Sequence, residues 1–335
     1  MAVAVSQGDM ARHFVQQNQN LLLRRALDQH TLELASGVTG DVSQHLGGDF
    51  SELARVRNGL TVINSYEDAN TTLTLRADGM QLSLELIREK VGTFAGTAQN
   101  TASMARGGTI DVELKEAERQ LEDLRATLNT RVSEQSLFAG IAADQQAIAP
   151  LADIYAALDP LIAGLTTAAD IEAAISTWMA DPAGFDTVAY TGDAARPDVR
   201  VGRAHSVSLT VTAGAPAMKE AFEGLLIAAY GHRNGNALTP DEKAALLTRS
   251  ADVLRNAEDG LTSLQAEVGQ TQARLEEAKT ATAAEKSALQ MSEAELIGVD
   301  AYETASELEA TRLQLELLYT VTARLSRLSL AEYLR

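Results

Sequence analysis

The chain has 335 residues, of which 45% are hydrophobic and 4% aromatic, a formal net charge of −18 and no cysteine. The charge argues against nucleic acid and anionic membrane surfaces as partners, because no basic stripe is present to bind phosphate. Without cysteine, disulfide bonds, thiolate nucleophiles and zinc ribbons are excluded. No apolar run approaches the ~18 residues of a membrane-spanning helix, and the N-terminal sequence lacks the pattern of a secretory signal. We therefore expect neither membrane insertion nor a cleavable leader.

The first predicted element is a helix over about 9–35, which ends at the sequence "LASG". Gly37 can take the left-handed conformation that commonly follows the last turn of a helix. The next segment, 37–50, contains four glycines and has little hydrophobic periodicity. We therefore expect it to connect two helices, as either an ordered or a mobile segment.

Long helices are predicted on both sides of the centre of the chain. Apolar residues recur in steps of three and four over 73–98 and 114–128, and again over 254–278. This spacing is typical of the seam of a coiled coil or helical bundle. The seam residues are Leu73, Ala77, Met80, Leu84, Ile87, Val91, Phe94, Ala98, Leu114, Ala117, Leu121, Leu124, Leu128, Leu254, Ala257, Leu261, Leu264, Val268, Thr271, Leu275 and Ala278.

The last long helix has a clear predicted start at "LTPDE". Thr239 can serve as the N-cap, Pro240 as the first helical residue and Glu242 as the second half of a capping box. From there to the end of the chain, little apart from Gly298 interrupts the helical pattern. At ~1.5 Å per residue, even the part before Gly298 is longer than the ~50 Å diameter of a compact globule of this size. The predicted molecule is therefore an elongated rod in which helices from the two termini pair.

All six prolines lie between residues 150 and 240, which predicts a mixed insert between two proline-free helical arms. Within the insert, "DTVAYTG" and "VRVGRAHSVSLTVTAG" are predicted as strands, and residues 218–229 as a helix. The fold prediction is mainly α, with long antiparallel helices and a central α+β insert that contains short strands. The predicted domains are an inner core domain of terminal helices (1–50 with 296–335), a helical rod domain (51–143 with 233–295) and a variable outer insert domain (144–232).

The sequence contains no pattern that indicates catalysis. Its five histidines are scattered, and no zinc-binding, phosphate-binding or nucleophile-elbow motif is present. Asn70 begins a glycosylation sequon, but it falls within a predicted helix, so we attribute the match to chance. An enzyme housed in the insert would need a clustered polar pocket that the sequence does not indicate. We expect no enzymatic activity, no metal and no cofactor.

The C-terminal helix carries more apolar side chains than one partner helix can cover, whereas the N-terminal helix, with Phe14 and Leu21–Leu23 interrupted by amides, fits either a packed array or a weak helix with a solvated face. The final stretch, "TVTARLSRLSLAEYLR", has no glycine or proline to end a helix. Each leucine left in water forgoes ~1.5–3 kcal/mol of transfer free energy, so such a surface belongs inside an assembly. The candidate interface residues are Phe14, Leu21, Leu22, Leu315, Leu318, Val321, Leu325, Leu328, Leu330, Tyr333 and Leu334.

Three short motifs, in the same order along the chain, resemble elements of a known family. "TARLSRLSLAEYLR" at 322–335 resembles the C-terminal signature of the flagellar hook–filament junction proteins, the third hook-associated protein, in the flagellin-like superfamily. "TLELASG" at 31–37 resembles the end of that family's first helix, and "NTRVSEQSLFAG" at 129–140 resembles the turn after its second rod helix. The resemblance covers about 1–143 and 240–335, whereas the insert resembles the family's outer domain only in position and in its strand-rich character.

The chain departs from the family's pattern at two places. After "LASG" the family usually has a basic residue and then a run that contains proline, whereas this chain has "VTGDVSQHLGGDF". Before "LFAG" the family usually has an aromatic residue, whereas this chain has Ser136. Flagellin, the filament subunit, shares the architecture but usually ends differently, and "SLAEYLR" favours the junction protein. A cytosolic coiled-coil adaptor that binds a partner through its rod is the remaining alternative.

The resemblance implies a structural protein whose terminal helices form the inner domain of a tubular flagellar assembly. It implies a ring of identical subunits between an adjacent hook-associated junction protein and flagellin, outside the cell. It also implies export through the flagellar type III apparatus without a cleaved signal, and a cytosolic export chaperone that covers the C-terminal helix. We hypothesise that the candidate residues from Leu325 to Leu334 are disordered in the monomer and become ordered on assembly. Ordering costs ~1–2 kcal/mol per residue, which one partner helix would barely offset.

Overall fold

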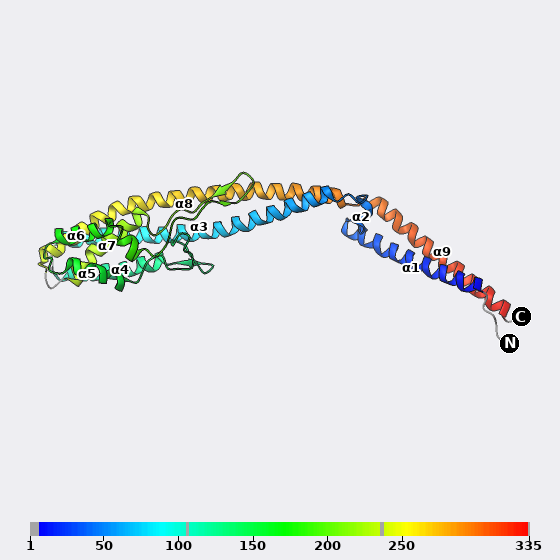
Figure 1. Ribbon diagram of the computed structural model, residues 1–335, viewed down its shortest axis with the longest axis horizontal. Coiled ribbons are helices and arrows are strands. Elements are labelled where there is room, and N and C mark those ends of the chain that lie inside the picture. The colour runs from blue at the N-terminus through cyan, green and yellow to red at the C-terminus, as the bar shows by residue number, and fades with distance from the viewer. Residues whose placement is uncertain (1–6, 105–106, 235–237, 334–335) are drawn as a thin grey trace. The chain divides into compact units, whose positions relative to one another are not determined.

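The computed structural model of the chain describes residues 7–104, 107–234 and 238–333, and the side chains of 14–104, 108–234 and 238–324. In the described ranges the chain is mainly α-helical, as predicted (Figure 1). No helix in these ranges has the apolar length that spanning a bilayer requires. The helices are α1 (Gln7–Ser36), α2 (Val42–His45), α3 (Ser51–Met104), α4 (Gly107–Leu128), α5 (Leu151–Ile162), α6 (Ala168–Ala180), α7 (Pro216–Arg233), α8 (Pro240–Ile297) and α9 (Ala301–Tyr333).

The described strands form two small antiparallel pairs. β1 (Arg131–Val132) pairs with β2 (Gln135–Ser136), and β3 (Val199–Arg200) pairs with β4 (Ser206–Val207). The strand predicted for "VRVGRAHSVSLTVTAG" is therefore right only around the β3–β4 hairpin. The remaining valines and leucine of that segment are buried in the core, but the described residues there form no further strand. The insert is less rich in strands than the sequence predicted.

The chain packs as two compact units. Unit 1 comprises Met1–Ile63 with Ala283–Arg335, and unit 2 comprises Asn64–Thr282. Helices α3 and α8 each contribute residues to both units. The division into three domains that the sequence suggests remains a prediction.

Unit 2 is a helical bundle built on the predicted seams. The seam residues over 73–98, 114–128 and 254–278 are buried, apart from the half-buried Leu264. The predicted steps of three and four are confirmed, because the residues at these steps form the buried face of each helix. Asn70 is also buried, and its side-chain amide donates to the Val201 carbonyl at 2.8 Å.

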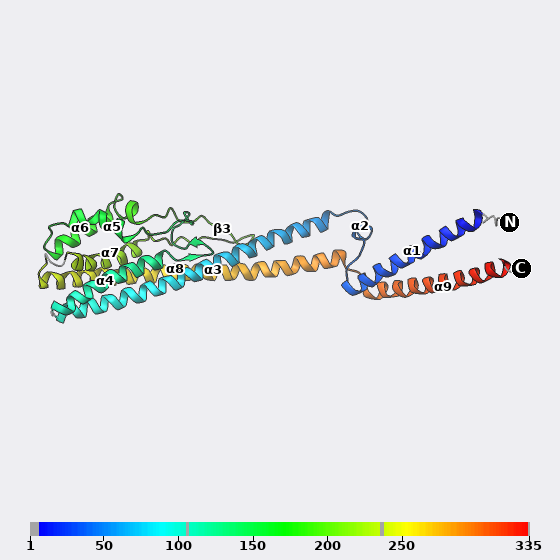
Figure 2. The same ribbon diagram turned by 90° about the horizontal axis from the view of Figure 1, so that it is seen from below.

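Helices α3 and α8 lie side by side and antiparallel within unit 2 (Figure 2). Gln272 Nε2 donates to Asp78 Oδ1 over 2.7 Å, and Arg88 Nη1 lies 4.0 Å from Glu258 Oε1. Residues later in α3 therefore contact residues earlier in α8, as expected for antiparallel helices. Helices α4 and α7 pack against each other, and α6 packs on α7.

The "DTVAYTG" segment, predicted as a strand, is instead a π-helical turn, η1 (Phe185–Ala189). The Phe185 ring is buried between Trp178 and Phe222, with centroids 6.3 and 5.7 Å away. Phe185 and Ala189 are buried while Thr187 between them is exposed, whereas a strand that buried the first two would bury the third on the same face. The strand prediction was wrong because an alternating run this short does not separate the two periods.

Helix α8 begins at Pro240 as predicted, and Thr239 Oγ1 accepts a hydrogen bond from Glu242 N at 3.3 Å. The Glu242 carboxylate, which was predicted to complete a capping box, instead accepts from Ala168 N over 2.6 Å. Ala168 is the first residue of α6, where unpaired N–H groups favour a negative charge. The capping-box prediction was half right, because spacing along the chain does not reveal the donors that folding brings close.

The "LFAG" motif ends at a glycine that the fold requires. Gly140 has a φ of +62°, and a Cβ at this position would lie 2.2 Å from Ala194 O. We predict that Gly140→Ala lowers the free energy of unfolding by at least ~2 kcal/mol, through this clash and backbone strain. Urea unfolding followed by circular dichroism measures the change.

Gly96 provides the control for this substitution. It lies inside α3, and a Cβ there would meet nothing within 4 Å. Gly96→Ala should therefore raise the free energy of unfolding by ~0.5–1 kcal/mol, because alanine loses less backbone entropy than glycine in a helix. An unchanged unfolding midpoint for Gly140→Ala would contradict the structural role assigned to the motif.

Candidate functional site

The terminal helices α1 and α9 lie side by side as an antiparallel pair in unit 1 (Figures 1 and 2). Arg24 Nη2 and Nε donate to the Tyr319 hydroxyl at 2.9 and 3.2 Å. Further along the pair, His30 Nδ1 lies 3.5 Å from Glu307 Oε2. Polar contacts between side chains, Arg24–Tyr319 and His30–Glu307, therefore help to join the two helices.

Among its described side chains this pair has no fully buried apolar residue, and its apolar contact is limited to half-buried side chains such as Leu23, Leu27, Leu315 and Leu318. Within 14–36 of α1 only Glu33 is fully buried, and within 301–324 of α9 only Thr304 and Thr311 are. All three side chains are polar. The bundle of unit 2, by contrast, buries complete leucine and valine side chains along each seam. The two terminal helices therefore gain less burial energy from each other than the helices of unit 2 gain along their seams.

Large apolar side chains lie instead on the outside of the pair. Phe14 is 66% exposed, Leu22 63% and Leu317 57%. So many exposed apolar groups on one helix pair indicate a surface that other chains cover. The exposed set on α1 and α9 is Phe14, Val15, Leu21, Leu22, Leu32, Leu34, Tyr302, Leu313, Leu317, Tyr319 and Val321.

The residues predicted as an interface fall into three groups. Those found exposed are Phe14, Leu21, Leu22 and Val321, and those found half-buried are Leu315 and Leu318. Helix α9 continues to Tyr333, but the side chains outside the described part are those of Leu325, Leu328, Leu330 and Tyr333. Leu334 lies outside the described residues altogether. Their role as an interface remains a prediction.

The structure adds residues that the sequence reasoning did not select. Leu32 and Leu34 were considered only as part of the "TLELASG" motif, and Tyr302 follows the break in the C-terminal helix. Their signal was their apolar character at positions outside the half-buried stripe of α1 and α9. Between the helices a groove is lined by Gln19, Leu22, Leu23, Gln314, Leu317, Leu318 and Val321.

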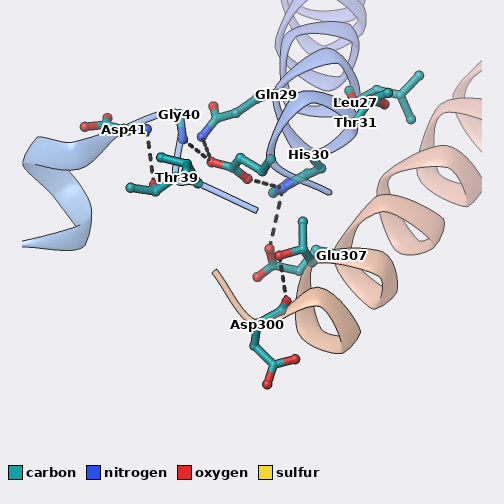
Figure 3. A network of polar contacts seen from close by, with 12 residues as sticks. Leu27, Gln29, His30, Thr31, Thr39, Gly40, Asp41, Asp300 and Glu307 are labelled. Carbon is teal, nitrogen blue, oxygen red and sulfur yellow. Dashed lines mark hydrogen bonds and ion pairs between the residues drawn. The ribbon is translucent and has the colours of Figure 1, made fainter. Parts of the chain in front are cut away.

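Polar contacts hold the end of α1 to the connector that follows it (Figure 3). The buried Glu33 carboxylate accepts hydrogen bonds from Gln29 Nε2 at 2.9 Å and from Gly40 N at 2.8 Å. Its second oxygen lies 3.2 Å from His30 Nδ1, the same nitrogen that faces Glu307. One carboxylate thus fixes α1, the connector and, through His30, α9.

The connector 37–50 has a defined path around this carboxylate. Gly37 has a φ of +71°, as predicted for the residue after the helix. Thr39 N donates to Ile297 O at 2.9 Å, and Val299 N donates to Gly37 O at 3.1 Å. The connector therefore pairs with the predicted break between α8 and α9, and it also contains the short helix α2.

The surroundings of Glu33 keep its carboxylate charged. Burial raises the pKa of this group, but hydrogen bonds from Gln29, Gly40 and His30, together with the His30 charge, outweigh burial. The net result is a pKa below the ordinary value of 4.5. In the described residues no group of three or more His, Asp and Glu side chains is placed to hold a metal, so this cluster acts through hydrogen bonds.

Because folding lowers the Glu33 pKa, its carboxylate stabilises the junction above the unfolded value near 4.5, and this stabilisation is lost as the pH falls through the folded value. We predict that the Gly40 amide, corrected for intrinsic exchange, loses protection from hydrogen exchange below pH 4.5. Glu33→Gln should leave Gly40 weakly protected at every pH. Equal protection at about pH 3 and about pH 6 in the unchanged protein would contradict this assignment.

A pair of terminal helices without an apolar core, with large apolar groups on its outside, is typical of subunits that pack into larger assemblies. Residues 252–334 match the family model described as the bacterial flagellin C-terminal helical region. This stretch, most of α8 together with α9, is similar to that region of flagellin. The match supports a flagellin-like family and a structural role in the extracellular bacterial flagellum. None of the curated proteins compared with the chain matches it.

Proposed function

We propose that this chain is a structural component of the bacterial flagellum that joins the hook to the filament and assembles through α1 and α9. The observation that carries the proposal is the terminal helix pair without an apolar core, in a chain whose C-terminal region is similar to that of flagellin. The junction role is supported by the "SLAEYLR" ending and by the two motifs that precede it.

In this proposal, assembly completes the core that α1 and α9 lack. Each large apolar side chain that a neighbour covers contributes ~1.5–3 kcal/mol of transfer free energy. Copies of the chain form a ring, which contacts an adjacent hook-associated junction protein on one side and flagellin on the other. No catalytic step, metal or cofactor has a part in this function.

The same surface needs protection before assembly. A cytosolic export chaperone covers the C-terminal helix, and the chain then leaves through the flagellar type III apparatus without a cleaved signal. Helix α9 already extends to Tyr333 in the single chain. We propose that neighbouring subunits cover the candidate side chains from Leu325 to Leu334 on assembly, and that this burial offsets the entropy lost when those side chains are fixed.

Charge placed on the exposed surface of α9 tests the assembly role. We predict that Leu317→Asp leaves the monomer soluble and folded but abolishes filament attachment, because a buried unpaired carboxylate is costly. Leu161→Asp is the matched control: Leu161 is 51% exposed on α5 and Leu317 is 57% exposed. Motility and electron microscopy of cells that carry each variant measure the outcome. Normal filaments with Leu317→Asp would overturn the role of this surface.

The alternative is that the chain is itself a flagellin, the filament subunit, which is equally compatible with the match to the flagellin C-terminal region. Deletion of the gene followed by electron microscopy separates the two functions. For a junction protein we predict intact hooks without filaments, and flagellin shed into the medium. Hooks without filaments and without shed flagellin would assign the chain as the filament subunit, and normal filaments would contradict both.

A further inference from the structure

Two arginines in unit 2 direct their guanidinium groups at the same oxygen atom. Arg76 Nη1, on α3, lies 2.7 Å from Gln135 Oε1, and Arg196 Nη2, in the loop before β3, lies 3.4 Å from it. Their other acceptors are backbone carbonyls: Ser136 O at 2.9 Å from Arg76 Nη2, and Gly140 O at 3.0 Å from Arg196 Nε. Among the described residues, no carboxylate forms an ion pair with either arginine.

Burial makes this arrangement costly. Arg76 is 4% exposed, and burial together with the nearby Arg196 charge lowers its pKa to about 10, so it remains charged at neutral pH. A buried charge is normally paired with an opposite one, because neutral acceptors do not replace the lost hydration. Arg76 instead donates to an amide oxygen and a backbone carbonyl, both neutral, although the chain carries 46 acidic side chains against 28 basic ones.

Within the described part of the chain, both guanidinium groups are therefore held by neutral acceptors alone. A charged carboxylate forms stronger hydrogen bonds with a guanidinium group than a neutral amide does. The pair of arginines would therefore bind a carboxylate more strongly than it binds the Gln135 amide.

Gln135 occupies the position that such an acceptor would take. Its side chain is exposed, on β2 of the β1–β2 hairpin, so the amide can turn into water without disturbing the core. A carboxylate has the shape of the Gln135 amide, and guanidinium groups bind carboxylates through paired, charge-assisted hydrogen bonds.

We propose that Arg76 and Arg196 form an acceptor site for a carboxylate side chain of a second copy of this chain, which displaces the Gln135 amide on assembly. The occupant follows from charge complementarity: a chain with net charge −18 presents many carboxylates to its neighbours, and this site is a basic pair without an internal acid. The choice of a second copy rests on the proposed assembly, whereas the preference of the site for a carboxylate does not.

The first experiment places the carboxylate within the chain itself. In the monomer, Gln135→Glu should raise the thermal midpoint by about 2 °C or more, because the new carboxylate pairs with both arginines. Gln145→Glu adds the same charge at another exposed glutamine in this unit and should leave the midpoint unchanged or lower it. Arg196→Gln combined with Gln135→Glu should reduce the gain, because only Arg76 then remains to pair with the carboxylate. Equal midpoints for the two glutamate variants would overturn the carboxylate site.

The second experiment tests the occupant in the full chain. Sedimentation of assembled protein should show that Gln135→Glu raises the concentration needed for assembly by about tenfold or more, because the internal carboxylate excludes that of the neighbour. Gln145→Glu should assemble like the unchanged protein. A higher thermal midpoint with unchanged assembly would keep the carboxylate site but overturn the second copy as its occupant. Failure of the unchanged chain to assemble would remove that occupant and the proposed function, while the monomer result would stand.

Discussion

The terminal helices α1 and α9 depend on burial that they do not obtain from each other. The only buried residues of their described parts are Glu33, Thr304 and Thr311, and every buried apolar side chain of the described chain lies elsewhere. Isolated helices are marginal in water, and in proteins most of their stability comes from packing an apolar face. The pair therefore keeps its apolar groups available for neighbours, which is a property suited to a subunit and costly for a protein that works alone.

Directional polar contacts determine where this pair begins, although apolar packing is weak along its length. Two glycines and one carboxylate form the junction: Gly37 takes a left-handed conformation, and a Cβ at Gly298 would lie 2.4 Å from Ala294 O. Glu33 then holds the connector through the Gly40 amide. Hydrogen bonds of this kind specify geometry more than they add stability, since each replaces a bond to water. Unit 1 therefore has a defined chain path before any partner supplies the missing burial.

A feature of the fold could be predicted from the sequence when the residues that determine it lie close together along the chain. The seams over 73–98, 114–128 and 254–278 were predicted correctly, because helical periodicity repeats over many residues and averages out exceptions. The caps at Gly37 and Thr239 were also predicted, since a helix end is decided by residues close in sequence.

The rest depended on contacts between distant segments. The Glu242 carboxylate binds the N-terminus of α6, and the predicted strand overlaps a helical turn in which Phe185 packs on Phe222. The Arg76–Gln135–Arg196 cluster joins a helix, a hairpin and a loop that no sequence pattern relates. At the terminal helices the apolar excess was visible in the sequence, but the absence of a core between α1 and α9 required their pairing to be seen.

Hydrogen exchange followed by mass spectrometry, on the monomer and on the assembled protein, tests the central claim most directly. It compares peptides from 14–36 and 301–324 with peptides from the α3 seam over 73–98. The account predicts that the terminal peptides of the monomer exchange at least ~100-fold faster than the seam and become as slow as the seam on assembly. Terminal peptides that already exchange as slowly as the seam in the monomer would show that the pair is complete by itself, and would contradict the account.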